Sequence, residues 1–403
     1  MTGYIKKTEM KRKYFLGTVT FYLFVILSCY VFVKMRLTLS AMSNTAAFSQ
    51  NSNIEKKDKM EFINRCRRRI ESKTKISQKL WNSQYKSPCY HREGTLHCLP
   101  YFLVIGFPKC GTTDLFERMK HHPEFIPSKM KELHWLSRYR FMPLFRRNST
   151  VQIEKYSPDK PFGLHLYTQM FDELAATIET SDGHSHAISA DFSPSTIWDN
   201  DVYSYINSFS VGPEYYTQDF VHQLNPCMKL VVMMRDPVER LYSDYLFING
   251  QNTAHEFHKK VKHVIKLYKS CMKLKSPREC FQDFNLARKS KIRLRIGAYS
   301  VFIKEWLKVF PREQIYFVRM EDYVSNTKKV LGDIFTFLDM DMVSEDVMKR
   351  MLQQTPSNTR QSRGISFEPM YNKTHKLLSQ FYGPFNHNLS MLLQNKDYTW
   401  HET

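Results

Sequence analysis

The sequence predicts an α/β fold of three layers, in which a central parallel sheet lies between helices. Residues 101–105 form a short, continuous apolar run of the kind found in buried parallel strands. A glycine-containing loop follows this run directly, and apolar residues at helical spacing follow the loop. Apolar runs and helical stretches then alternate along the chain, as α/β folds require. We expect further strands at 187–190, 229–234 and 314–318, and helices at 238–248, 300–310 and 323–338.

Length and charge limit the organisation of the chain and the classes of partner. With 403 residues and 42% hydrophobic composition, the chain has room for one catalytic domain with appendages, which we place at residues 88–403. The formal net charge of +20 favours polyanionic partners, such as a sulfated glycan, nucleic acid or an acidic membrane. No zinc-finger, RNA-binding or basic leucine-zipper pattern is present, so the sequence favours no nucleic-acid partner.

An uncharged run near the N-terminus predicts a membrane anchor. Residues 14–33 are long enough to cross a bilayer as a helix. More positive residues precede this run than follow it, so residues 1–13 are expected in the cytosol and the remainder in the lumen. Residues 34–87 are polar and read as a lumenal stem. A cleaved signal peptide is the alternative, but its apolar core is usually shorter.

A lumenal position predicts glycans and disulfides. Sequons occur at Asn148, Asn372 and Asn388. Besides one cysteine in the apolar run and one in the glycine loop, six remain for bridges. Close spacing favours two pairs, although sequence alone does not determine the pairing; no Cys/His cluster with zinc spacing is present. The favoured pairs are Cys89 with Cys98 and Cys271 with Cys280, which leaves Cys66 and Cys227.

The loop Gly106–Thr113 has the composition of an anion-binding loop. Glycines let backbone N–H groups approach a phosphate, the following helix N-terminus adds positive potential, and Lys109 adds a charge. Thr112 and Thr113 offer hydroxyl donors. The loop is P-loop-like in its place between strand and helix, but its lysine precedes the second glycine, so it does not fit the G-x-x-x-x-G-K-[ST] pattern of nucleotide triphosphatases.

The loop resembles the 5′-phosphosulfate-binding loop of Golgi sulfotransferases, whose pattern is P-K-[CSA]-G-T-[TS]. The resemblance implies that 3′-phosphoadenosine 5′-phosphosulfate (PAPS) is the co-substrate and that no metal ion is required. It also predicts the sulfotransferase fold for the catalytic domain, with a Golgi, type II membrane location. The loop residues that would hold PAPS are Pro108, Lys109, Cys110, Gly111, Thr112, Thr113 and Asp114.

A second segment, Arg235–Tyr245, resembles the R-D-P-x-x-R-x-x-S motif of the same family. By that resemblance Arg235 and Ser243 hold the 3′-phosphate, and a guanidinium fork suits such a ligand. Arg240 can instead pair with Glu239 or Asp244 on its own helix. The family's G-x-Y segment corresponds to Tyr299, which could equally begin a helix. A late basic loop over the nucleotide corresponds to Arg363 and Gly364.

Sulfuryl transfer needs a base for the hydroxyl proton and a cation for the departing phosphate. Lys131–Trp135 resembles the K-E-x-H-[FW] segment of glycosaminoglycan sulfotransferases, so we assign Glu132 as the base, His134 as the alternative base or a substrate contact, and Lys109 as the cation. A surface ion pair is the competing interpretation of Glu132, and a packed core position that of His134. Asp191 and Ser193 correspond to the family's substrate-facing strand end, although an Asp there is often only a cap.

The segments Leu99–Trp135 together are most similar to carbohydrate sulfotransferases that add 6-O-sulfate to N-acetylgalactosamine 4-sulfate in chondroitin. That resemblance implies a sulfated glycosaminoglycan acceptor, while an assembly of identical chains stays open. Two other classes remain: a catalytically silent glycan-binding membrane receptor and a nucleotide kinase. A kinase would need a magnesium-binding Asp at a strand end, but the matching strand ends in Arg235.

Overall fold

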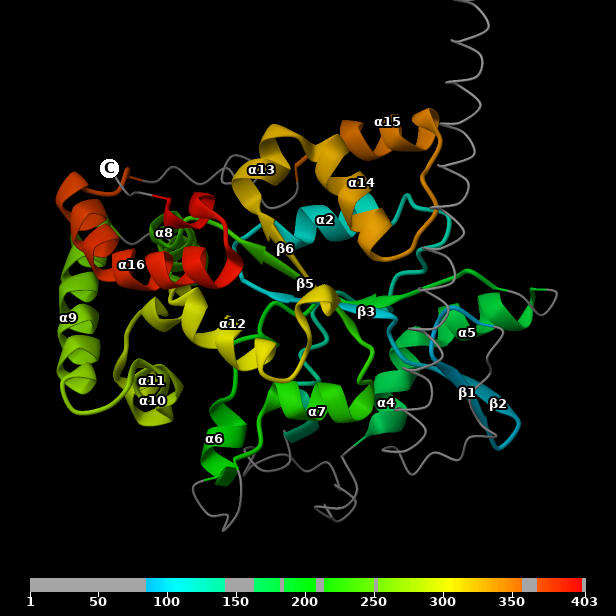
Figure 1. Ribbon diagram of the computed structural model, residues 1–403, viewed down its shortest axis with the longest axis horizontal. Helices are drawn as coiled ribbons and strands as arrows, with labels where there is room; N and C mark the ends of the chain where they lie inside the picture. Colours follow the sequence, from blue (N-terminus) through cyan, green and yellow to red (C-terminus); the bar gives the residue numbers. More distant parts are fainter. Residues whose placement is uncertain are drawn as a thin grey trace, which may run out of the picture. The chain divides into compact units, whose positions relative to one another are not determined.

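A computed structural model describes residues 85–141, 163–181, 185–207, 214–249, 253–356 and 368–400 (Figure 1). The expected cytosolic tail, the membrane run at 14–33 and nearly all of the stem lie outside these residues, so these assignments stay predictions. Within the described ranges, no helix combines the length and the apolar character that a membrane crossing requires.

Four parallel strands form the central sheet, as the apolar runs predict. They are β3 (Phe102–Gly106), β4 (Ala190–Asp191), β5 (Lys229–Met234) and β6 (Ile315–Arg319), in the order β4-β3-β5-β6. Every residue of β3 is buried, which explains its unbroken apolar sequence. The strand expected at 187–190 is wrong in extent, because Ile188 instead forms an isolated bridge with Phe125 and only Ala190–Asp191 joins the sheet.

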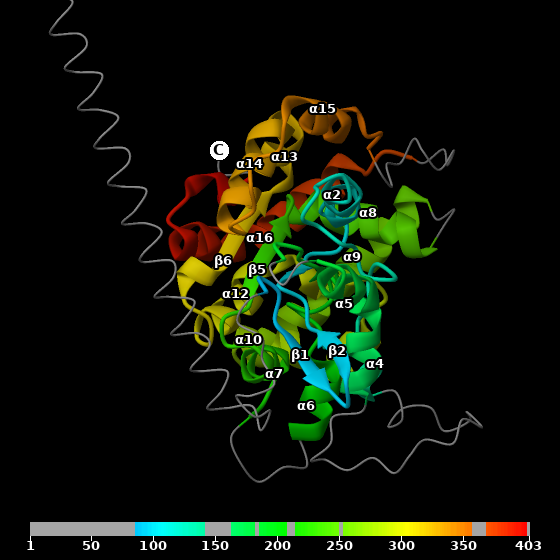
Figure 2. The same cartoon turned by 90° about the vertical axis from the view of Figure 1, so that its right-hand side faces the viewer.

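Helices lie on both sides of this sheet. In Figures 1 and 2, α2, α14 and α15 lie on one side, and α7 and α12 on the other. The helices around the sheet are α2 (Thr112–Met119), α4 (Leu164–Thr168), α5 (Asp172–Glu179), α6 (Asp201–Asn207), α7 (Thr217–Leu224) and α8 (Pro237–Asn249). They continue with α9 (Ala254–Met272), α10 (Pro277–Gln282), α11 (Phe284–Lys289), α12 (Tyr299–Leu307), α13 (Met320–Ser325), α14 (Thr327–Phe337), α15 (Glu345–Gln353) and α16 (Asn372–Leu393).

Two of the three expected helices are single elements, and the third is divided. The stretch 238–248 is α8, and 300–310 is α12, which ends at Leu307. The single helix expected over 323–338 is wrong. Asn326 leaves the helical conformation between α13 and α14, and its side chain accepts a hydrogen bond from the Lys329 N–H. An asparagine that caps the following helix is favourable there, which accounts for the break.

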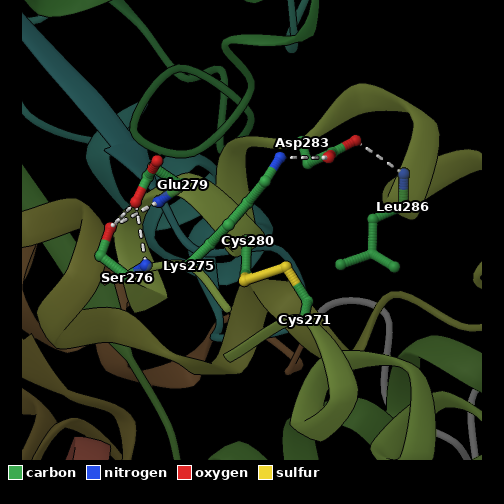
Figure 3. The surroundings of a disulfide bond; sticks show 7 residues. All are labelled: Cys271, Lys275, Ser276, Glu279, Cys280, Asp283 and Leu286. Atoms are coloured by element: carbon green, nitrogen blue, oxygen red, sulfur yellow. Dashed lines mark hydrogen bonds and ion pairs between the residues drawn. A yellow bond between two sulfur atoms is a disulfide. The ribbon is translucent and has the colours of Figure 1, made fainter. Parts of the chain in front are cut away.

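Both closely spaced cysteine pairs are disulfides, as the spacing favours. Cys89–Cys98 closes the antiparallel hairpin of β1 (Cys89–Arg92) and β2 (Thr95–Cys98). Cys271–Cys280 joins the end of α9 to α10 (Figure 3).

Capping residues fix the chain beyond that second disulfide, as Figure 3 also shows. Ser276 and Glu279 form a capping box at the start of α10, and Asp283 caps α11 by accepting from the Leu286 N–H at 2.9 Å. The disulfide therefore links α10 to the end of α9, and the caps fix where α10 and α11 begin.

Candidate active site

The glycine loop connects β3 to α2 in a conformation that requires its glycines. A Cβ on Gly106 would lie 2.5 Å from the Ile197 side chain, and Gly111 has a φ of 86° as the residue before α2. Behind the loop, Phe107 is fully buried and packs on Tyr299 with ring centroids 4.4 Å apart. Lys109 also has a left-handed φ of 67°. Contacts with Ile197 and Tyr299 therefore shape the first part of the loop, and its last residues lead into α2.

The start of α2 has the properties of an anion site. Among the described residues, no side chain caps the first turn of this helix, so its N–H groups remain for a ligand. Thr112, Thr113 and Asp114 lie within the first turn of α2, whose N-cap residue is Gly111. The Asp114 carboxylate points inward, to Arg118 Nε at 2.7 Å and to the Tyr323 hydroxyl at 2.7 Å, and its expected role in holding PAPS stays a prediction.

Arg235 lies beside the loop because β3 and β5 are neighbouring parallel strands, whose carboxyl ends meet at one edge. The Phe107 N–H donates to the Met233 carbonyl at 2.6 Å, and the Tyr299 hydroxyl donates to the Arg235 carbonyl at 2.8 Å. Tyr299 also lies 4.0 Å from Cys110 Sγ, and burial raises the pKa of that thiol to about 12. Tyr299 begins α12 and, from a buried position, contacts both the glycine loop and Arg235.

The helix α8 has one buried face and one more exposed face. Arg240 is fully buried, with Nη1 3.4 Å from the Asp244 carboxylate, so one expected pairing on its own helix is observed. Ser243 is half-buried, and Phe247 follows it four residues later on the same face. The Lys109 ammonium lies 4.0 Å from the Phe247 ring centroid. Phe247 was not predicted from the sequence, although its spacing from Ser243 could have indicated it.

Glu132 and His134 meet in a tight loop, and both have left-handed backbone conformations. The Glu132 carboxylate lies 2.5 Å from Lys131 Nζ and 3.3 Å from His134 Nε2. Burial acts to raise the pKa of Glu132, but the hydrogen bond from His134 and the charge of Lys131 outweigh it and lower the pKa to about 2. Glu132 is therefore ionised across the physiological range.

The surroundings of His134 favour a positioning role over that of a base. Nδ1 shares a 2.7 Å hydrogen bond with Ser195 Oγ, which lies 3.1 Å from Ser137 Oγ. Because an ionised Glu132 accepts only, Nε2 donates to it, while Nδ1 is engaged by the Ser195 hydroxyl. In this arrangement neither nitrogen of His134 is open to a proton from an acceptor, so the carboxylate is the better placed base.

Asp191 and Ser193 support this loop from beneath. The Ser193 hydroxyl accepts from the His134 N–H at 2.8 Å and donates to Asp191 at 2.5 Å, while Tyr167 donates to the other Asp191 oxygen at 3.1 Å. Burial raises the pKa of Asp191 above its ordinary value, although both hydrogen bonds act in the opposite direction. Both residues are 1% exposed, so any effect they have on an acceptor passes through the loop above them.

The remaining expected residues divide between described and undescribed segments. Arg363, Gly364 and Asn148 lie outside the described residues. Asn372 and Asn388 are exposed on α16 and so are accessible to a glycan.

Comparison with known proteins identifies the family. The sulfotransferase domain family matches residues 99–381, which include the glycine loop, the Glu132 loop and α8. The chain belongs to the sulfotransferase family. This confirms the resemblance found in the sequence motifs.

The chain is similar to mouse carbohydrate sulfotransferase 15, with 40% identity over 314 residues, and to the human protein of that name, with 38% over 320 residues. Each match covers 76% of this chain and 56% of the relative, so the chain spans just over half the length of these relatives. A crystal structure of a sulfotransferase from Alicyclobacillus acidocaldarius aligns with a TM-score of 0.44 and 19% identity, over 74% of this chain and 96% of that one.

Proposed function

We propose that this chain transfers a sulfuryl group from PAPS to a hydroxyl of a glycosaminoglycan. The observation that carries the proposal is the meeting of Lys109, Arg235 and the uncapped start of α2 at one edge of the sheet. These groups fit the phosphosulfate and the 3′-phosphate of PAPS, because backbone N–H groups, an ammonium and a guanidinium fork all bind phosphate oxygens. Ser243, Tyr299 and the loop Arg363–Gly364 complete the proposed nucleotide site.

In the proposed reaction, Glu132 accepts the proton of the acceptor hydroxyl as that oxygen forms its bond to sulfur. The bond between sulfur and the bridging oxygen of PAPS breaks, and adenosine 3′,5′-bisphosphate leaves with the electron pair. Lys109 and the N–H groups of α2 stabilise the charge that develops on the departing phosphate. His134 and Ser193 hold the base in place, and no residue requires a metal ion for this sequence of events.

The acceptor that we propose is the 6-hydroxyl of N-acetylgalactosamine 4-sulfate in chondroitin or dermatan sulfate. Support comes from the Glu132 loop motif and from the similarity to carbohydrate sulfotransferase 15. The net charge of +20 would attract such an acceptor. We further propose a Golgi location, with the membrane run at 14–33 as a type II anchor and residues 88–403 in the lumen.

The test incubates the full chain, in detergent, with sulfur-labelled PAPS and separate chondroitin, dermatan, heparan and keratan acceptors. Transfer to chondroitin 4-sulfate that is lost in Lys109→Ala supports the proposal, and an exposed residue, Lys349, provides the matched control as Lys349→Ala. No transfer to any of the four polysaccharides would overturn it. Binding of PAPS without transfer would instead favour the silent glycan receptor, and a requirement for magnesium would favour a kinase.

A further inference from the structure

A cavity of about 220 Å³ lies next to the proposed base loop, and its wall is rich in arginine. The four arginines face a single acidic residue of the wall, Asp201. The residues that line the cavity are Arg138, Trp198, Asp201, Tyr268, Ala287, Arg288, Ser290, Ile292, Arg293 and Arg295. None of the residues assigned to PAPS is among them, so the cavity is separate from the nucleotide site.

Buried carboxylates hold two of these arginines from behind. Asp199, whose side chain is 5% exposed, bonds to Nε of Arg138, and Asp244, which is 1% exposed, bonds to Nε and Nη2 of Arg293. The two arginine side chains themselves are 38% and 34% exposed. Within the described residues, both Nη atoms of Arg138 and Nη1 of Arg293 have no hydrogen-bond partner. The guanidinium groups are thus fixed in direction with donors left for a ligand.

The other two arginines complete the wall with different surroundings. Arg295 is buried, bonds to Asp201 at 2.7 Å and so contributes little free charge. Arg288 is exposed on α11, with its guanidinium 5.6 Å from the Phe284 ring, and no carboxylate pairs with it among the described residues. The charge available to a ligand therefore comes mainly from Arg138, Arg288 and Arg293.

The cavity and the proposed base are built on the same two segments of chain. The Arg138 N–H donates to the His134 carbonyl at 2.9 Å, which places Arg138 one turn after the base loop. The Trp198 and Asp199 N–H groups donate to the Ser195 carbonyl, and Ser195 bonds to His134 through its side chain. A glycan whose hydroxyl lies at Glu132 would therefore extend past Arg138.

We propose that this cavity binds an anionic group that the acceptor glycan already carries, either a sulfate ester or a uronate carboxylate. The inference deepens the proposed function and rests on it. Oxyanions of both kinds match guanidinium forks in geometry and charge, and a partly enclosed site strengthens such hydrogen bonds. The cavity would select acceptors with a charged group at a fixed distance from the reacting hydroxyl.

The test measures acceptor KM, PAPS KM and kcat for the full chain and two variants, Arg288→Ala and Arg138→Lys. Arg138→Lys keeps the charge opposite Asp199 but loses the fork, and the control is Arg350→Ala, an exposed arginine on α15 that does not line the cavity. The acceptors are chondroitin 4-sulfate oligosaccharides and their desulfated counterparts. Melting temperatures check that each variant is folded.

We expect the acceptor KM to rise about tenfold in both cavity variants, the loss of one charge-assisted hydrogen bond, with PAPS KM unchanged. A rise confined to the sulfated acceptor identifies a sulfate ester as the ligand, and an equal rise for both acceptors identifies the carboxylate. Acceptor KM values that match those of Arg350→Ala would overturn the inference. If the unaltered chain transfers no sulfuryl group, the proposed function fails. The cavity is then tested by the Kd of the same oligosaccharides for the unaltered chain and each variant. Equal Kd values for all of these proteins would overturn the proposed cavity site.

Discussion

Replacing Glu132 with glutamine gives the sharpest test of the proposed chemistry. Glutamine keeps the size of the side chain but only one of the two oxygens that contact Lys131 Nζ and His134 Nε2. It loses the ability to take a proton. General bases contribute about 10²- to 10⁴-fold to a rate, which corresponds to about 3–5 kcal/mol of activation free energy. We therefore expect kcat to fall about 10³-fold with little change in PAPS KM.

The pH dependence separates a carboxylate base from an imidazole base. With a pKa of about 2, Glu132 stays ionised, so kcat/KM should show no loss from this group between pH 4.5 and 8. An imidazole base would lose activity near pH 6–7, where histidines titrate. Lys131→Ala removes one of the interactions that lower the pKa of Glu132, so it should move the acid limit of activity to higher pH. Glu313→Gln, at an exposed position, is the matched control.

The same pKa predicts a small effect on stability. Since the pKa of Glu132 is lowered from 4.5 to about 2 in the folded chain, its ionised form contributes stability above about pH 4.5, which is lost as the pH falls through about 2. The side chain is 41% exposed, so solvent screening keeps this contribution below about 1 kcal/mol.

Two kinetic outcomes would refute Glu132 as the base. One is activity of Glu132→Gln within threefold of the unaltered chain, and the other is a loss of activity on the acid side near pH 6.5.

Three further changes test the supports of the site. Arg240→Ala should lower the free energy of unfolding by about 3 kcal/mol, because it breaks a fully buried pair with Asp244; chemical denaturation measures this. Replacing both cysteines of the α9–α10 disulfide with serine should lower the free energy of unfolding by about 2.5 kcal/mol, because the bridge closes a loop with a sequence separation of 9. The same change should raise acceptor KM more than PAPS KM, since α11, which follows α10, lines the cavity. Phe247→Leu should lower kcat about two- to fivefold, since a half-exposed ring contributes about 0.5–1 kcal/mol to holding the Lys109 ammonium; steady-state kinetics measure this.

Each of these changes has an outcome that contradicts its reasoning. An unfolding free energy for Arg240→Ala within 1 kcal/mol of the unaltered value would mean that water or other groups solvate Asp244. Equal effects of disulfide loss on both KM values would place the disulfide's influence outside the cavity. A Phe247→Leu variant with unchanged kcat but a lower melting temperature would make this ring a packing element only.

The sequence could predict the donor side of the site because its residues are close in the chain. Apart from its first residue, Lys229, β5 is apolar, and it was predicted at its observed bounds; the glycine loop was correctly predicted between a strand and a helix. From adjacent parallel strands it follows that Lys109 and Arg235 share an edge. The apolar runs, the glycine loop and the rule that parallel strands end at one edge of the sheet were therefore sufficient to predict the donor side.

On the acceptor side the sequence pointed to residues but not to their geometry, because that geometry depends on contacts between distant segments. The lowered pKa of Glu132 depends on a loop that Ser193, 61 residues from Glu132 in sequence, holds through the His134 N–H. The cavity combines Arg138 and Arg293, which no periodicity connects. The helix break at Asn326 was missed for a similar reason. The apolar pattern continues across this residue and favours one helix, but the Asn326 side chain caps α14 and ends α13.

The proposed donor and acceptor sites are connected through α8. Just before this helix lies Arg235, the proposed ligand of the 3′-phosphate, and Asp244 in its second half binds both the buried Arg240 and the cavity residue Arg293. Arg240 also donates to the Arg293 carbonyl at 3.1 Å. A rigid helix fixed at both sites keeps the proposed 3′-phosphate position and the acceptor cavity at a constant separation. This arrangement would align the acceptor hydroxyl with the bound sulfuryl group without a large rearrangement, which is the positional contribution that group transfer requires.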